Sequence, residues 1–232
     1  MSIGYDNLDI NHNMVLDLRF KEGVGAVAYD ASKNRNQFTL THAPAWYNIP
    51  ATGQPGLNFT AGDPDFLEAA IADVPDMDFT SEDFSYAGWI NTDSLVGDRM
   101  VFCHGLLNTE GFYMLILADG SVSFISNQGA ASQSIISTAG DVVINTPTLI
   151  GFSRSGTLGQ IFINGREVVY STQDNLTDPL TSARKFLFGI YDDETTDPWS
   201  QYMFRQRFWI NRQLVKEEHE FIYNSESARN GV

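Results

Sequence analysis

One short stretch of the chain concentrates side chains that could bind a metal ion. Four carboxylates fall within positions 192–197, namely Asp192, Asp193, Glu194 and Asp197. Calcium prefers several carboxylate and carbonyl oxygens that converge from loops, so this stretch predicts a calcium site. Crowded carboxylates also repel one another, and a solvated acidic loop without a metal ion is the alternative interpretation.

A second candidate calcium site combines two segments that lie apart in the sequence. Asp30, Asn34 and Asn36 follow the first predicted strand, and Asp63 and Asp65 flank a proline in a later turn. Their oxygens converge only if a β-sandwich brings both turns to the same end of the fold. Calcium is the one cofactor for which the sequence offers a chemical case.

Four aromatic residues lie in or beside polar segments that are expected to be loops. Tyr191 and Trp199 flank the acidic stretch, while Trp46 and Tyr47 lie together in another long segment. Aromatic rings next to acids and amides can stack on sugar rings, so these four residues are candidate ligand contacts. The alternative is that they anchor their loops by packing on the core.

The residue spacing argues against a nucleophilic or metal-dependent enzyme. Residues 151–156 (GFSRSG) are similar to the Gly-x-Ser-x-Gly turn of serine hydrolases, but Ser155 stands where that turn requires glycine. The four histidines show no spacing typical of metal ligands, and Cys103 lies in an apolar stretch without a cation beside it. These observations favour a non-catalytic protein.

Composition and charge limit the classes of partner. The 232 residues carry 14 Lys and Arg against 29 Asp and Glu, which gives a net charge of −15, and 43% of the residues are apolar. The basic patch that nucleic-acid binding requires is missing, and no apolar run approaches the roughly 20 residues of a membrane-spanning helix. A single cysteine excludes an intramolecular disulfide. We expect a globular protein without a nucleic-acid partner or membrane insertion.

Alternating apolar residues predict β-strands along most of the chain, for example at 14–20 and 84–90. Asp119-Gly120 and Asn164-Gly165 each separate two such runs, which predicts two tight antiparallel hairpins. About a dozen short strands of this kind indicate an all-β sandwich or barrel.

The remaining segments complete the predicted organisation. Residues 44–56 and 129–140 lack apolar periodicity and are expected to be loops. Only residues 214–224 have helical spacing, which predicts one short helix docked on a sheet. Residues 14–232 are expected to form a single domain, preceded by an arm or an extra edge strand at 1–13.

The strand and turn motifs follow one another in a specific order. They are residues 14–23 (MVLDLRFKEG) with 29–34 (YDASKN), 57–62 (LNFTAG) with 66–68 (FLE), 83–91 (DFSYAGWIN), 159–168 (GQIFINGREV), and 208–214 (FWINRQL) with Glu218 and Tyr223. This order, over roughly residues 14–224, resembles the laminin G-like (LamG) domains of the concanavalin A-like lectin/glucanase superfamily. The resemblance implies an all-β fold, an antiparallel two-sheet jelly-roll sandwich with a short C-terminal helix.

The chain departs from this family at positions that carry chemistry. Laminarinase-type hydrolases of the fold use a Glu-x-Asp-x-x-Glu strand or a form one residue shorter, yet no Glu here is followed two positions later by Asp. Arg205 and Gln206 stand where the family commonly has an Asp pair that helps to hold a structural calcium ion. Modules of this family usually work outside the cell, but the first residues (MSIGYD) show no secretory signal, so we expect synthesis in the cytoplasm.

Three hypotheses follow for the function. The first is a non-catalytic binding or adhesion module that recognises a glycan or a protein surface through loops at the rim of the sandwich. The alternative is a virion structural protein, such as a capsid decoration or tail-associated protein on the virion surface, that uses the jelly roll for homo-oligomer or particle assembly and for host adhesion. A divergent glycoside hydrolase or lyase is the third hypothesis.

Overall fold

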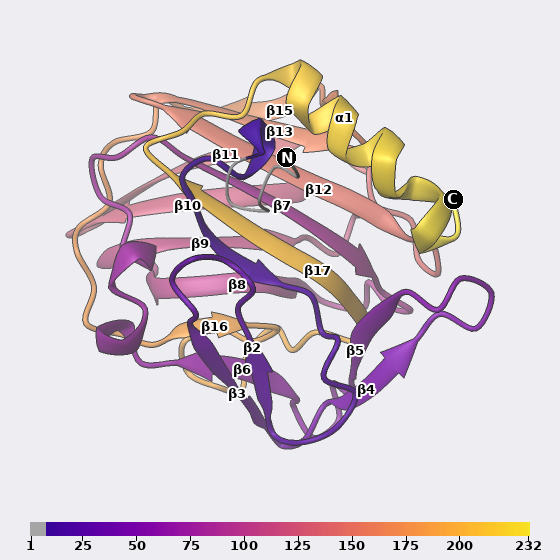
Figure 1. Cartoon of the computed structure of the whole chain (residues 1–232). Coiled ribbons are helices and arrows are strands. Elements are labelled where there is room, and N and C mark those ends of the chain that lie inside the picture. Colours follow the sequence, from indigo (N-terminus) through magenta and orange to yellow (C-terminus); the bar gives the residue numbers. More distant parts are fainter. Residues whose placement is uncertain (1–7) are drawn as a thin grey trace.

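The structure, a computed structural model, describes residues 8–232 and consists of two antiparallel β-sheets packed face to face (Figure 1). In spatial order, the first sheet contains β14 (Arg166–Glu167), β13 (Leu158–Ile163), β12 (Thr148–Ser155), β7 (Phe84–Asn91), β17 (Gln201–Ile210), β5 (Pro55–Phe59) and β4 (Ala45–Asn48), with β1 (Met14–Leu18) also paired to β17. We call it sheet A.

The second sheet, sheet B, has nine strands within the described residues. They are β15 (Tyr170–Gln173), β11 (Ala131–Ser137), β10 (Val122–Gln128), β9 (Glu110–Ile116), β8 (Arg99–Leu106), β16 (Phe186–Phe188), β6 (Phe66–Ala69), β3 (Gln37–Thr41) and β2 (Val27–Tyr29). The predicted two-sheet jelly-roll sandwich is thereby confirmed. The predicted C-terminal helix is also present as α1 (Lys216–Glu226), and it begins and ends two residues later than residues 214–224.

The main core lies between the two sheets and is rich in phenylalanine. Alternate residues of each strand point inward, as the period-two pattern predicts. Phe208 of β17 contacts Phe102 of β8 and Phe186 of β16 edge to face, with ring centroids 5.0 and 5.5 Å apart. Aromatic contacts of this geometry across the sandwich fix the two sheets relative to one another.

The outer face of sheet A is also covered. Helix α1 lies across it in Figure 1, and Ile222 of this helix belongs to the same buried apolar cluster as Trp89 and Trp209 of the sheet. The short turn η2 (Asp9–Asn11) covers the same face, since Trp209 Nε1 donates to Ile10 O at 2.8 Å. Residues 1–7 of the predicted arm lie outside the described residues.

The outer face of sheet B is covered by a loop, residues 190–198. Met100 N donates to Asp197 O at 2.9 Å, and the Tyr191 ring contacts Tyr113 edge to face at 5.5 Å. Beneath this loop Cys103 is fully buried, and burial raises the pKa of its thiol far above the ordinary value. Sheet B therefore presents a smaller open surface than its strand number suggests.

The two predicted hairpin turns are confirmed. Asn164 and Gly165 adopt φ angles of 51° and 77° between β13 and β14, as a two-residue hairpin turn requires. Asp119-Gly120 joins β9 to β10, with Gly120 N donating to Leu117 O at 2.9 Å.

Two predicted loops were wrong because each contains an edge or near-edge strand. The 44–56 segment includes β4, the last strand of sheet A, and the 129–140 segment includes β11. Five of the seven residues of β11 are exposed or only half-buried, so its small polar side chains show no apolar period. Its place in sheet B rests on backbone pairing with β10 and β15. In residues 8–232, the helices are too short and polar for any of them to cross a membrane.

Candidate functional site

A pocket of about 460 Å³ opens on the outer side of sheet A, beside the C-terminal end of α1. Its walls come from the end of β1, the β4–β5 hairpin, β17 and the turn η5 (Ser227–Asn230). The lining residues are Arg19, Lys21, Gly53, Gln54, Pro55, Arg205, Glu226, Arg229 and Asn230. Its size lies within the roughly 300–1,000 Å³ that is usual for small-ligand sites.

Four of the fourteen cationic side chains of this acidic chain line the pocket. Arg19 and Lys21 flank Phe20, which turns with a φ of 54° and buries its ring in the core. With Phe20 anchored inward, its two basic neighbours lie at the surface. Arg229 lies on η5, which Thr52 of the β4–β5 hairpin holds by donating its hydroxyl to Arg229 O at 2.5 Å.

A β-bulge positions the fourth cation, Arg205. Met203 pairs with Ile90 and Gln206 with Gly88, so β17 has one residue more than β7 over this stretch. A bulge bends its strand and redirects a side chain. The Gln206 side chain lies on the core side of the bulge, where its Oε1 accepts from Tyr86 Oη at 2.5 Å. The Arg205 side chain extends to the outer face.

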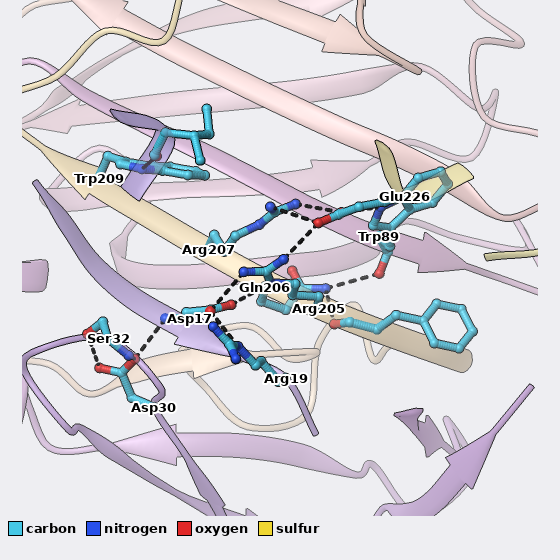
Figure 2. A network of polar contacts seen from close by, with 12 residues as sticks. Asp17, Arg19, Asp30, Ser32, Trp89, Arg205, Gln206, Arg207, Trp209 and Glu226 are labelled. Carbon is cyan, nitrogen blue, oxygen red and sulfur yellow. Dashed lines mark hydrogen bonds and ion pairs between the residues drawn. The ribbon is translucent and has the colours of Figure 1, made fainter. Parts of the chain in front are cut away.

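Arg205 joins two carboxylates in a buried polar network (Figure 2). Its Nε and Nη2 donate to the two oxygens of Asp17 at 2.6 and 2.9 Å, and its Nη1 donates to Glu226 Oε1 at 2.8 Å. Arg19 Nε also donates to Asp17, at 2.7 Å. Burial alone would raise the pKa of the Asp17 carboxyl, but the hydrogen bond and charge of Arg205, helped by Arg207 and Arg19, hold this pKa far below its usual range.

Glu226 completes the network from the end of α1. Arg207 donates to both of its oxygens at 3.1 and 2.9 Å, and Trp89 Nε1 donates to Oε2 at 2.9 Å. Burial opposes ionisation of Glu226, yet the charges of Arg207 and Arg205 lower its pKa. Both carboxylates are therefore ionised and fully engaged with cations near neutral pH, so neither is a ready proton donor or nucleophile.

Three guanidiniums thus face two carboxylates within the network, and Lys21 and Arg229 add further positive charge at its open side. Both of these side chains are exposed, and neither forms an ion pair within residues 8–232. The pocket is consequently a local positive region in a chain of net charge −15.

A larger hollow of about 660 Å³ lies over β3 and β6 and has a different character. Its cations Arg35 and Lys185 are matched by Glu68 and Asp73 in the lining, and Lys185 is already paired with Glu68. Asn34 also lines it. Its charges balance, so the smaller pocket is the stronger candidate site.

The sequence-predicted aromatic contacts do not form one site. Trp199 is fully buried in the main core, which contradicts its prediction as a sugar-stacking residue. Trp46 is half-buried and donates Nε1 to Gly25 O at 2.9 Å, and Tyr47 stacks on Tyr202 with ring centroids 4.0 Å apart. Tyr191 lies on sheet B, where its hydroxyl accepts from Leu107 N at 2.9 Å.

The residues of the second predicted calcium site, which combines the Asp30 and Asp63 segments, are separated. Asp30 is buried and accepts from Asp17 N at 2.8 Å and from Ser32, so it supports the loop after β1 (Figure 2). Asn34 donates to Asp76 at 2.8 Å, whereas Asp63 is exposed beside His42. Asp65 instead accepts from Thr60.

Three carboxylates of the acidic loop at 192–197 each have a separate partner and do not converge on one point. Asp192 pairs with Arg184, Glu194 pairs with Lys185 at 2.7 Å, and Asp193 accepts from Thr196 N at 2.7 Å. Burial and the charges of Asp98 and Asp193 raise the pKa of Asp197. No three His, Cys, Asp or Glu side chains in residues 8–232 are grouped to hold a metal ion. Calcium binding stays a prediction.

A Ser–His contact is also present but is sealed inside the protein. Ser153 Oγ lies 2.9 Å from His219 Nε2, both residues are fully buried, and His219 Nδ1 has no hydrogen-bond partner within residues 8–232. A nucleophile needs solvent access and an oriented base. The contact is therefore structural, as the missing glycine at Ser155 suggests.

Sequence reasoning missed the basic pocket because its residues are spread between positions 19 and 229. One signal was available: Arg19 and Lys21, like Arg205 and Arg207, are two residues apart in strand-like segments. Residues with that spacing share a face of a strand.

Comparison with known proteins shows which family the chain belongs to. Residues 68–218, more than half of the chain, match the laminin G family model described as the concanavalin A-like lectin/glucanases superfamily. The chain belongs to the concanavalin A-like lectin/glucanase superfamily. No curated protein sequence matches the chain.

Solved structures with the same superfamily fold include the binding domain of Paraclostridial Mosquitocidal Protein 1, with a TM-score of 0.72 at 12% identity, over 94% of this chain and 53% of that one. The binding domain of botulinum neurotoxin DC in complex with rat synaptotagmin II has a TM-score of 0.66 at 14% identity, over 94% and 52%. A structure of botulinum neurotoxin type C, whose cell entry depends on two ganglioside molecules, has a TM-score of 0.68 at 16% identity, over 94% and 52%.

This concanavalin A-like chain spans about half the length of those structures. At such low identity the likeness shows the fold alone. Functional arguments for the chain therefore rest on its own pocket and charges.

Proposed function

We propose that the chain is a non-catalytic binding module that recognises a glycan or a protein surface through the pocket on the outer side of sheet A. The observation that carries this proposal is the state of two carboxylates, Glu226 in the pocket lining and Asp17 buried behind it. Asp17 and Glu226 are both neutralised by arginines, while exposed basic side chains line the opening. Such a site offers hydrogen-bond donors to a ligand and no acid–base pair to cleave it.

Two further points support a binding role. The buried network holds Arg205 in one orientation, and preorganised polar groups lose less entropy when a ligand binds. Among the structurally similar domains, one was solved with a bound protein and another belongs to a toxin that needs gangliosides for entry. We extend this type of partner, a glycan or a protein surface, to the chain as part of the proposal.

The test pairs a glycan array with an assay for polysaccharide cleavage, both on the whole chain. We expect binding to one class of glycan, or capture of one defined protein, without release of sugars or unsaturated products. Cleavage that a single carboxylate substitution abolishes would overturn the non-catalytic role and favour the hydrolase or lyase hypothesis.

Assembly into a virion or a homo-oligomer stays a prediction from the sequence. Its test is independent of the pocket: co-purification with particles, and the mass of the protein in solution. A protein that is strictly monomeric and never particle-bound would contradict it.

A further inference from the structure

We propose that the pocket binds the anionic group of an acidic saccharide, a carboxylate or a sulfate carried on a sugar ring. This inference rests on the proposed binding function and names the chemical class of its ligand. It assigns direct contacts to Lys21 and Arg229 and a supporting role to the network behind Arg205.

The charge distribution carries the first step. The chain has 29 acidic residues, yet among residues 8–232 Glu226 is the sole acidic residue in the lining of this pocket, and its oxygens bind Arg205, Arg207 and Trp89. Lys21 and Arg229 have no carboxylate partner within the described part of the chain. Positive charge focused in a recess attracts an anion, while the acidic remainder of the surface repels it.

The construction of the site carries the second step. Asp17 is fully buried, and its two oxygens orient Arg205 from one side while Glu226 orients it from the other. The Arg205 side chain is still 22% exposed. A guanidinium that is held rigidly and remains partly accessible contributes to a pocket wall of fixed shape and charge.

The neutral part of the lining carries the third step. Gln54 and the turn at Gly53 and Pro55 form one wall, and the Gln54 amide can donate to and accept from hydroxyl groups. No aromatic ring from the described part of the chain lines the pocket. A neutral sugar would therefore lack the stacking surface that aromatic residues provide, whereas an acidic sugar gains charge-assisted hydrogen bonds. These features together favour an anion that also carries hydroxyls.

The experiment compares matched oligosaccharides by calorimetry: a sulfated one, its desulfated form, a uronate-bearing one and a sialylated one with its asialo form. We expect the acidic members to bind and the neutral partners to bind at least about tenfold more weakly. Binding should also weaken as salt is raised from 50 to 200 mM, because exposed charges are screened. The relative affinities of the sulfated and carboxylated probes identify which anionic group the pocket prefers.

A pair of double variants locates the site. K21A/R229A removes two exposed cations from the pocket, and we expect it to weaken acidic binding at least about tenfold. K33A/R166A removes one exposed lysine and one exposed arginine outside the pocket, neither of them ion-paired in residues 8–232, and should leave binding within about twofold. Unfolding temperatures of both variants should match that of the wild type.

The outcomes separate this inference from the proposed function. Equal binding of acidic and neutral partners, or equal weakening by the two double variants, overturns the inference and leaves a binding module. Binding to anionic lipid vesicles without binding to any saccharide also overturns it. Cleavage of a bound acidic saccharide would overturn the non-catalytic function while the anion site stands.

Discussion

The guanidinium of Arg205 donates to both carboxylate oxygens of Asp17, although 188 positions separate the two residues in the sequence. The contact joins β1 to the bulge in β17 and, through Glu226, to the end of α1. Asp17 is fully buried, so its charge depends on this partner. The same contact fixes the wall of the candidate pocket.

Removal of one member of this pair should destabilise the fold. For Arg205→Met we expect a loss of about 3 kcal/mol in the free energy of unfolding, since a buried carboxylate loses its main counter-charge while Arg19 remains. Urea unfolding of Asp17→Asn, Arg205→Met and the double variant measures the coupling between the two residues. The double variant should lose clearly less than the sum of the single losses, and strict additivity would contradict the interpretation.

Stability should fall in mild acid because of His219. Burial, with a smaller effect from the charge of Arg207, lowers its pKa from 6.5 to about 3. The unfolded chain takes up a proton below pH 6.5 and the folded chain does not, so this contribution to stability is complete above pH 6.5 and is lost as pH falls toward 3.

Comparison with His219→Gln isolates this effect from other titrating groups. Between pH 7.5 and 5 the wild type should lose about 2 kcal/mol more than this variant, by the conversion of about 1.4 kcal/mol per pKa unit. His12→Gln, at an exposed site, serves as the control and should follow the wild type. Parallel pH profiles for wild type and His219→Gln would refute the assignment.

Gly165 should tolerate alanine poorly because α1 packs against it. It has a φ of +77°, and an added Cβ would lie 2.7 Å from Glu220 Cα in the helix. Gly140 provides the matched control, because it has a φ of +86° and no atom of the described residues lies within 4 Å of an added Cβ. We expect Gly140→Ala to cost about 1 kcal/mol for the backbone conformation alone, and Gly165→Ala to cost about 2–3 kcal/mol, because the helix must also move. An equal loss of stability for the two variants in thermal unfolding would show that α1 moves away from the added methyl group at no cost.

The Asp197 carboxyl should be destabilising when ionised. Burial and the charges of Asp98 and Asp193 raise its pKa, so folding becomes less favourable as pH rises from 3.8 through the folded-state pKa. With a chelator at pH 7, Asp197→Asn should raise Tm by about 2 °C, and the gain should vanish below pH 3.8. Asn fits the φ of 54° at this position as readily as Asp does.

Two controls accompany the Asp197→Asn experiment. One is a neighbouring substitution that should change Tm in the opposite direction, and the other tests the calcium prediction. Asp193→Asn should lower Tm, because Asp193 accepts hydrogen bonds from Thr195 and Thr196 within the loop. Calcium added to the wild type should raise Tm if the loop binds it as the sequence predicts, and Asp197→Asn should remove that gain. No response of the wild type to calcium would contradict the prediction.

The sequence predicted the fold well wherever one face of a strand meets the core. The alternation at 84–90 and the Asn164-Gly165 turn depend on local rules, and both were confirmed in β7 and β13–β14. Strand β11 was missed because backbone pairing and not side-chain burial defines it. Local apolar patterns cannot report such a strand.

The candidate site was far less predictable. Trp199 looked like a ligand contact because it lies next to acidic residues, yet its ring is buried in the core. The pocket instead assembles Arg19 and Arg229 from distant parts of the sequence, and long-range contacts bring them together: β1 pairs with β17, and Thr52 donates to Arg229 O. The bulge that directs Arg205 outward has no signature in a single sequence.

The central position of β17 also governs when this protein can fold. The strand pairs with β1, β5 and β7, so sheet A lacks its middle until residues 201–210 have left the ribosome. Until then the nascent chain holds unpaired strand edges and an open phenylalanine core, the features that promote aggregation during synthesis. Formation of the fold is thereby deferred until residues 201–210 have been synthesised, and contacts over such sequence distances make it slow.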